Sequence, residues 1–469
     1  MSSTEGTRAR RRVRTTFGQR ARAVAPPVAA AVLLGLAWVL PGGADEDRAP
    51  EPVTVSRSTY GCPAGDDLSL VAGQVRPGSS ATARSLPDKT PIEALGGAGA
   101  WRREKVDADG VLMDQRGRGS GAVGFYGTSA GKSDGGGLVV GRCPPTEDES
   151  WYLGAGSGGK HLTTLVLTNL SSAPAVADVH FWGTEGKIDA VDAEGIVVDP
   201  YSVRRVELAD LAAGEAELGV RVDRRRGSLS VSAVDASTAV FRGTEAMEST
   251  AAPRRRQVVA GAPGGSGTRT LMLLNPTTST ARVGVEMFGA KGRFAPKDLD
   301  SVKVEAGRFV EVAVPASAGT DAAAVRLRSD QPVAAALRVA PDEKDHVVVE
   351  AQGPVTGPAV VPIDLGLGTR PPQLVLTALR GDGRVELTAY DRSMKRVDSA
   401  EVEVGPDTTR TVDLSSSKVL DTEGAAYVVV RVDGRVAGAA TYRTGSGIAS
   451  LGLRAAPVTV LGPQVRPAS

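Results

Sequence analysis

The chain has 469 residues, 41% of them hydrophobic and 23% charged, so it can bury a core and is not a wholly disordered protein. Its 55 basic and 54 acidic residues give a net charge of +1, which argues against a dedicated nucleic-acid binder. The 57 glycines and 29 prolines favour strands and turns over long helices, and with three histidines and two cysteines we expect no metal and no cofactor.

The N-terminus has the charge pattern of an export or anchor segment. Residues 1–24 carry seven arginines and are expected to be a basic tail that stays in the cytoplasm, because an apolar run at 28–40 follows them. Residues 25–41 are then a transmembrane anchor, although short for a span of about 20 residues, or a signal peptide cleaved near 42–44. Both interpretations place everything beyond the linker 42–52 outside the cytoplasm; the protein is single-pass with its N-terminus inside, or secreted if the leader is cleaved.

The next region, 53–147, is predicted to be a degraded β domain, with a Gly-rich, weakly patterned middle. Strand-like pieces occur at 53–55, 69–71 and 138–140. Cys62 and Cys143 are the only cysteines, and both lie in the exported part. In an oxidising compartment we expect them to form one disulfide, which would offset the thin core.

Three segments farther along repeat one strand pattern. Residues 165–169 (LVLTN), 271–275 (LMLLN) and 374–378 (LVLTA) mark the first strand of each copy, at spacings of 106 and 103 residues. Apolar and polar residues alternate in the strand that follows, as expected for a half-buried strand. Further short strands then recur in the same order, at 197–200, 302–307 and 402–406; at 206–208, 310–312 and 412–414; and as closing pairs at 218–222 with 229–234, 324–327 with 333–339, and 427–432 with 436–442.

Six or seven short strands in about 105 residues, joined by Gly/Pro turns, predict an all-β fold of tandem Ig-like β-sandwich domains. The expected boundaries are 148–263, 264–366 and 367–469, and each unit should have its own core. Residues 208–218 could form one short turn of helix.

Ser129 lies in a Gly-x-Ser-x-Gly pattern, which is typical of the nucleophile of α/β-hydrolases. That motif requires a strand before the serine and a helix after it, and the glycines at 135–137 argue against a helix. A flexible surface loop is the favoured interpretation of the pattern, so a serine hydrolase around Ser129 is kept only as an alternative.

An aromatic residue ends the second strand of every copy: Trp182, Phe288 and Tyr390. Alternation directs these rings away from the core of their own sandwich. Exposed there, they would be a candidate ligand surface that stacks on sugar rings; alternatively, a neighbouring unit or loop covers them.

Two runs of three arginines, 224–226 and 254–256, form compact basic patches. They could contact an anionic envelope polymer or lipid headgroups. A solvated turn and a solvated linker are the alternative interpretation.

Together, the basic N-terminus, the single apolar run, the repeated L-x-L-x-N strands and the preference for 44 arginines over 11 lysines resemble an actinobacterial family. That family consists of membrane-associated proteins with a domain of unknown function. The resemblance covers roughly residues 20–465 and departs from the asparagine marker at Ala378. It implies a location in the cell envelope and a genetic neighbourhood near a membrane glycosyltransferase, and it supplies no catalytic residues.

These observations lead us to expect a non-enzymatic cell-envelope protein that presents extracytoplasmic β-sandwich domains for binding or scaffolding and supports cell-surface glycan assembly. Its expected partners are an envelope membrane protein or a cell-wall polysaccharide, with no nucleic acid. Two alternatives remain open: a carbohydrate-binding protein that uses Trp182, Phe288 and Tyr390, and the serine hydrolase.

Overall fold

The computed structural model of the chain describes residues 52–65, 68–77, 80–98, 101–129, 136–238, 242–341, 345–445 and 447–461. The predicted tail 1–24, the apolar segment 25–41 and most of the linker lie outside these residues. Within the described part of the chain, no helix has the length and apolar character needed to cross a membrane. Contacts group Thr54–Val460 into one unit.

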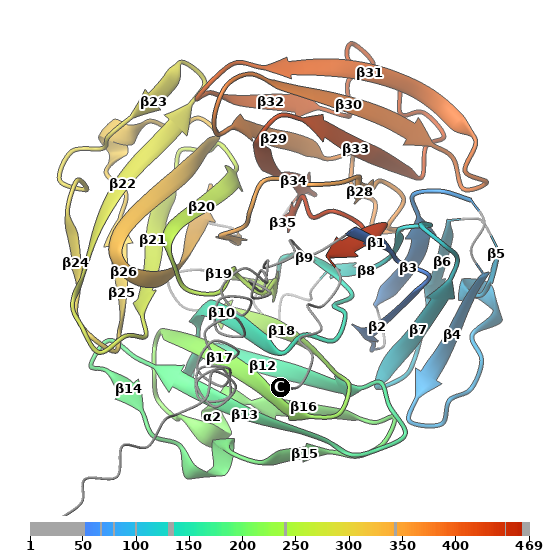
Figure 1. The fold of residues 1–469 in the computed structure, drawn as a ribbon, viewed down its shortest axis with the longest axis horizontal. Coiled ribbons are helices and arrows are strands. Elements are labelled where there is room, and N and C mark those ends of the chain that lie inside the picture. The colour runs from blue at the N-terminus through green and yellow to red at the C-terminus, as the bar shows by residue number, and fades with distance from the viewer. Residues whose placement is uncertain are drawn as a thin grey trace, which may run out of the picture. The chain divides into compact units, whose positions relative to one another are not determined.

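The unit is all-β, as predicted, and its sheets pack in pairs, each pair enclosing an apolar core (Figure 1). Four such sandwiches follow one another along the chain. Strands β1 (Pro52–Thr54) and β36 (Thr459–Leu461) lie at the two ends of the described residues. Helical structure is limited to short pieces: η1 (Glu93–Leu95), η3 (Val191–Ala193), α2 (Leu208–Leu211) and η4 (Ala316–Ala318).

The first sandwich is complete, and the prediction of a degraded unit is therefore wrong. The sequence pattern missed several of its strands because glycines and polar residues interrupt the alternation. Its disulfide is confirmed, and Cys62–Cys143 joins the first strand of one sheet to the residue after the last strand of the other. The sheets are β2 (Arg57–Pro63), β7 (Gly110–Arg116), β4 (Ser80–Leu86), β5 (Gly97–Ala98), and β6 (Arg102–Lys105), β3 (Ser69–Gln74), β8 (Ala122–Ser129), β9 (Leu138–Arg142).

The second sandwich contains the predicted strand series of the first copy, and the predicted helical turn is α2. One of its sheets contains β10 (Glu149–Ala155), β17 (Leu218–Arg226), β13 (Ala175–Trp182), β14 (Lys187–Ile188) and β15 (Ile196–Val198). The other contains β11 (Ser157–Gly158), β12 (His161–Asn169), β18 (Leu229–Thr238), β19 (Arg242–Met247) and β16 (Val203–Glu207).

In the third sandwich, one strand of 18 residues, β26 (Ala323–Ala340), runs through both sheets. The sequence predicts two strands here, because Asp330, Gln331 and Pro332 interrupt the apolar pattern. The partners of β26 are β20 (Arg254–Ala262), β22 (Ala281–Gly289), β21 (Thr268–Asn275) and β27 (Val347–Glu350), and the outer strands are β23 (Gly292–Phe294), β24 (Val302–Val304) and β25 (Arg308–Ala313).

The fourth sandwich pairs a sheet of β28 (Ala359–Pro362), β33 (Tyr427–Asp433), β30 (Gly383–Tyr390) and β31 (Arg396–Val404) with a second sheet. That second sheet holds β32 (Thr409–Asp413), β29 (Gln373–Ala378), β34 (Val436–Arg443) and β35 (Ile448–Gly452).

Two predicted boundaries, 263/264 and 366/367, are wrong by one strand. β20 pairs with β26 and so belongs to the third sandwich, and β28 pairs with β33 in the fourth. The Gly/Pro cluster at 263–265, which lies at the first of these boundaries, is part of the turn between β20 and β21. A Gly/Pro-rich segment therefore marks a turn within a sandwich as readily as a linker between two.

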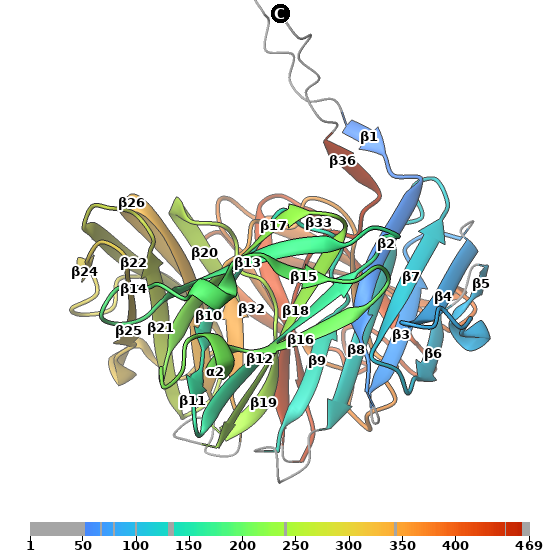
Figure 2. The same ribbon diagram turned by 90° about the horizontal axis from the view of Figure 1, so that it is seen from below.

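The four sandwiches close around a common axis, because each contacts the next and the fourth contacts the first. The last strand of each, β9, β19, β27 and β35, lies at the edge of its sheet and contacts the equivalent strands of its neighbours. Figure 1 shows β9, β19 and β35 near the centre. Figure 2 shows the unit from the side, with β9 standing roughly along the axis. An open sheet edge would otherwise offer unpaired N–H and C=O groups to other chains.

Acidic side chains hold these edges together. Asp345 Oδ2 accepts hydrogen bonds from the backbone N–H groups of Leu138 (3.2 Å), at the start of β9, and Ile448 (2.8 Å), at the start of β35. Glu350 Oε1 accepts one from Glu248 N (3.1 Å), just after β19. A buried backbone N–H without a hydrogen-bond partner costs free energy. These acidic side chains supply the acceptors that the carbonyl groups of a continuous sheet would otherwise provide.

Candidate functional site

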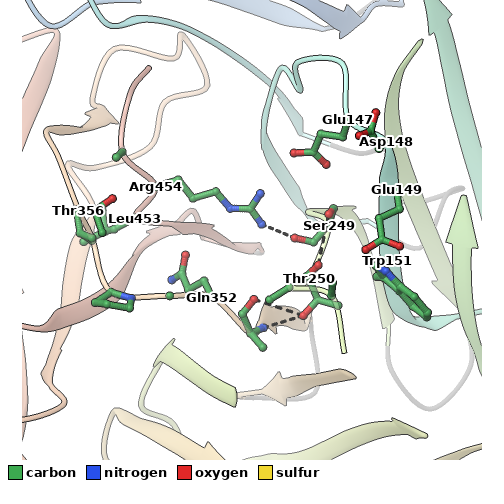
Figure 3. A pocket seen from close by; sticks show the side chains of 17 residues that line it. Glu147, Asp148, Glu149, Trp151, Ser249, Thr250, Gln352, Thr356, Leu453 and Arg454 are labelled. Carbon is green, nitrogen blue, oxygen red and sulfur yellow. Dashed lines mark hydrogen bonds between the residues drawn. The ribbon is translucent and has the colours of Figure 1, made fainter. Parts of the chain in front are cut away.

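A cavity of about 820 Å³ lies where the three inter-sandwich linkers and the segment after β35 meet at one end of the axis; we call it the axial cavity. The lining residues come from the segments that follow the edge strands β9, β19, β27 and β35, and from the start of β10. Figure 3 shows their side chains converging from these separate segments. The lining residues are 147–149, 151, 249–252, 351–356 and 453–455.

Next to the cavity, four charged side chains form the axial charge cluster: Arg142, Glu248, Glu350 and Arg454. Glu248 lies 3.6 Å from Arg142 Nε and 3.8 Å from Arg454 Nε. Arg142 Nη2 also donates to the carbonyl of Gly452 (3.0 Å), and Arg454 donates to the carbonyl of Ser249. The guanidinium groups of Arg142 and Arg454 thus connect the first, second and fourth sandwiches at their last strands and the segments that follow them.

Burial governs the protonation of this cluster. It raises the pKa of Glu350 well above its usual range, and the neighbouring Glu248 carboxylate adds to the effect. Burial lowers the pKa of Arg142. It also works to lower the pKa of Arg454, but the carboxylates Glu248, Glu350 and Glu147 outweigh it and the pKa is raised. The Arg454 guanidinium therefore remains positively charged beside the cavity.

Polar groups surround the rest of the cavity. Thr250 Oγ1 donates to the carbonyl of Ala335 (2.8 Å) and accepts from Ala351 N (3.0 Å). Gln352 Nε2 donates to the carbonyl of Gly438 (2.7 Å), whereas Gln352 Oε1 and Trp151 Nε1 are buried without a hydrogen-bond partner among the described residues.

The charge of the lining is acidic on balance: Glu147, Asp148 and Glu149 against Arg454. Burial raises the pKa of Glu147, although the positive charge of Arg454 opposes it. Carboxylate, amide and hydroxyl groups with one guanidinium suit a neutral, hydroxyl-rich molecule, because such a molecule both donates and accepts hydrogen bonds. No group of three or more metal-ligating side chains occurs within the described residues.

The predicted aromatic ligand surface is corrected by the burial of these rings. Trp182 is 5% exposed and Phe288 is fully buried, while Tyr390 is half-buried. All three do point out of their own sandwich, as alternation predicts, but Trp182 and Phe288 pack against the next sandwich, and Tyr390 is connected to the first sandwich through Tyr427. Trp182 stacks on Trp151 (5.6 Å between ring centroids) among side chains of the third sandwich, and Tyr390 stacks on Tyr427 (5.4 Å), which stacks on Trp101 of the first.

Ser129 lies at the exposed end of β8, and its backbone pairs with Leu138 in the antiparallel neighbour β9. This hairpin differs from the strand-to-helix turn that a nucleophile elbow uses. The three histidines contact other groups: His161 contacts Asp235 (2.9 Å), His180 contacts Asp223 (3.1 Å), and His346 Nδ1 donates to the carbonyl of Arg242 (3.0 Å). The structure therefore does not bring the predicted serine together with a histidine among its described residues.

Sequence reasoning missed the axial cavity and its cluster. Arg142, Glu248, Glu350 and Arg454 are about 100 residues apart in the chain, and none lies in a recognisable motif. Only the position of these residues in the chain could have located the cavity, because its lining follows the last strand of each sandwich. Those last strands were not predicted for the three copies. Only the closing of the four sandwiches around the axis brings the linkers together.

The fold and site thus define an all-β protein of four sandwiches with a polar cavity on their common axis. A sequence model described as a family of unknown function (DUF5719) matches residues 102–415, and the chain belongs to this family. The matched region begins in the first sandwich and ends in the fourth. No curated protein matches the chain.

Proposed function

We propose that this chain is a non-enzymatic protein of the cell envelope, which presents its four sandwiches outside the membrane and binds a hydroxyl-rich glycan in the axial cavity. The location is supported by the basic and apolar N-terminal sequence, since this charge order keeps residues 1–24 inside and exports the rest of the chain. The Cys62–Cys143 disulfide is in keeping with an oxidising compartment.

The observation that carries the proposal is the composition of the axial cavity. It combines carboxylates, an amide and hydroxyls with the Arg454 guanidinium. A volume of about 820 Å³ is large enough for a few sugar rings. Binding or scaffolding in this cavity requires no reactive side chain, and it would suit a role in supporting cell-surface glycan assembly.

The proposal is tested by pull-down of the full extracytoplasmic chain on purified cell-wall polysaccharide. The double variant Glu149→Gln/Thr356→Tyr changes two exposed lining residues, removing a carboxylate and obstructing the cavity. We expect it to lose binding at an unchanged melting temperature. The matched control, Glu194→Gln/Ser172→Tyr, changes exposed residues of similar types outside the cavity and should bind like the wild type. Equal binding by both variants would contradict the proposal.

The absence of enzymatic activity is tested separately. A fluorophosphonate probe reacts with activated serine nucleophiles, and we expect no labelling of the wild-type chain. Labelling that disappears in Ser129→Ala would replace this proposal with the serine hydrolase. As a separate experiment, crosslinking in intact cells would identify which envelope protein or polysaccharide lies beside the sandwiches.

A further inference from the structure

A second cavity, of about 550 Å³, is lined by six arginines and by no acidic residue; we call it the arginine pocket. We propose that it binds a ligand carrying several phosphate groups. The inference rests on this pocket alone and does not require a ligand in the axial cavity. The six arginines are Arg254, Arg256, Arg326, Arg328, Arg380 and Arg435.

Strand geometry gathers three of these arginines, Arg256, Arg326 and Arg328, on one sheet face of the third sandwich. Arg326 and Arg328 are two apart on β26 and point to one side of that strand, whereas Arg254 lines the pocket from beyond a register shift in β20. The register places Arg256 directly opposite Arg328 and Arg326 opposite Val258. Like charges in directly opposed positions destabilise a sheet, and a bound anion would relieve that repulsion.

The fourth sandwich contributes the other two arginines from loops between its strands. Arg380 lies between β29 and β30, and Arg435 lies in the turn between β33 and β34. The backbone holds these segments together, because Leu379 N donates to the carbonyl of Arg435 (2.8 Å). The pocket therefore spans the junction of two sandwiches, and its shape depends on their packing.

The charge of the pocket is largely uncompensated. Glu286 lies 2.7 Å from Arg326 and 3.8 Å from Arg328. No carboxylate of the described residues forms an ion pair with Arg254, Arg256, Arg380 or Arg435 in the structure. Six positive charges less one negative charge leave a net +5 at the pocket.

Phosphate groups fit this arrangement better than one small anion. The planar guanidinium fork matches phosphate oxygens and can bind them through two hydrogen bonds. One phosphate monoester carries a charge of about −2, so a single group neutralises less than half of the +5. The ligand therefore carries at least two phosphates in close succession. The pocket shares Gln352, Gly353 and Pro354 with the axial cavity, so one extended molecule can reach both.

Calorimetric titration with tripolyphosphate tests the inference, with inorganic phosphate as the single-group probe. The wild-type chain should bind tripolyphosphate more tightly than inorganic phosphate, and increasing salt should weaken the binding. Arg254→Ser/Arg256→Ser removes two exposed arginines that form no ion pair with a described carboxylate, and it should weaken tripolyphosphate binding by about tenfold or more. The control Arg118→Ser/Arg226→Ser makes the same change in net charge at exposed positions outside the pocket and should bind like the wild type.

A second arm distinguishes the source of the phosphates. Vesicles of phosphatidylglycerol and phosphatidylcholine are sedimented with the wild type and both variants. Sedimentation that is lost in Arg254→Ser/Arg256→Ser assigns the pocket to lipid headgroups, and tripolyphosphate binding without vesicle binding assigns it to a soluble or polymeric phosphate. The inference is overturned if neither probe binds the wild type, or if both double variants bind equally.

Discussion

Asn169 and Asn275 are the only asparagines of the chain, and their side chains make the same set of hydrogen bonds. Each is buried at the end of the first strand of its copy. Asn169 Nδ2 donates to the carbonyls of Ala173 (2.8 Å), Val198 (3.0 Å) and Asp199 (3.0 Å), and Asn275 repeats the pattern with Ser279, Val304 and Glu305. The asparagine of the L-x-L-x-N pattern therefore connects two turns of one sandwich through these hydrogen bonds, which we call the asparagine clamp.

Removal of this clamp should destabilise the fold. Asn169→Ala leaves buried carbonyls without a donor, and we expect the free energy of unfolding to fall by about 2–4 kcal/mol. Asn169→Asp retains the acceptor for Ser171 N (3.0 Å) but loses the donor, so it should also destabilise the chain. Ser172→Ala, an exposed neighbour, serves as the control. Urea denaturation measures all three, and an Asn169→Ala variant as stable as the control would contradict the role of the clamp.

A second prediction at this scale concerns His346. Burial lowers its pKa to about 4, and the charge of Arg338 adds to the effect. In the unfolded chain the imidazole takes up a proton near pH 6.5, so between about pH 6.5 and 4 the unfolded state binds more protons than the folded state. The contribution of His346 is therefore complete above pH 6.5 and is lost as the pH falls toward 4, by up to about 3 kcal/mol.

His346→Asn isolates this effect, because the amide can still donate to the carbonyl of Arg242 but does not titrate. The stability difference between the wild type and the variant should shrink as the pH falls from about 7 to about 4. Glu245 and Glu350, whose pKa values burial raises, act in the opposite direction in both chains and cancel in the comparison. A pH-independent difference would show that His346 does not titrate as described.

Among the elements, the second strand of the first two copies joins neighbouring sandwiches through the aromatic residue near its end. β13 places Trp182 against Trp151 and against Met272, Leu274 and Phe309 of the third sandwich. β22 places Phe288 against Leu379 and Ala437 of the fourth. Alternation gave these rings the correct direction, but it does not show whether solvent or another element lies on that side.

Trp182→Ala should therefore reduce stability by about 3–5 kcal/mol, because it leaves a cavity in the junction of two sandwiches. Trp182→Phe keeps an aromatic contact and should cost less. Chemical denaturation gives both values. Unchanged stability together with lost binding to cell-wall polysaccharide would instead favour the sugar-stacking interpretation of this ring.

For the unit as a whole, the first and fourth sandwiches share one apolar cluster. Val71, Phe125 and Leu138 of the first pack with the core of the fourth, and Trp101 stacks on Tyr427 (4.8 Å between ring centroids). Gly73 is required beside this ring, since a Cβ there would lie 2.4 Å from Trp101 Cε3. Ala246 of the second sandwich packs in the core of the first, so the four sandwiches are connected in a closed circuit of apolar contacts.

We therefore expect Thr54–Val460 to unfold in one cooperative transition despite its four sandwiches. Calorimetry should give equal calorimetric and van't Hoff enthalpies. Trp101→Ala should shift the entire transition to lower temperature. Separate transitions, with only one of them moved by Trp101→Ala, would show that the sandwiches unfold independently.

The all-β class, the order of strands in the three copies and the Cys62–Cys143 pairing could be predicted from the sequence, because they depend on local alternation and on the count of cysteines. Local patterns failed where β26 crosses an interruption at 330–332 and where the glycines of the first sandwich weaken the alternation.

The axial cavity and the arginine pocket were decided by the tertiary structure alone. Arg142 meets Glu248 across an interval of about 100 residues, and Arg256 is brought near Arg380 only by the junction of two sandwiches. Such contacts carry no periodic signal in the chain, because they depend on how whole sandwiches close around an axis.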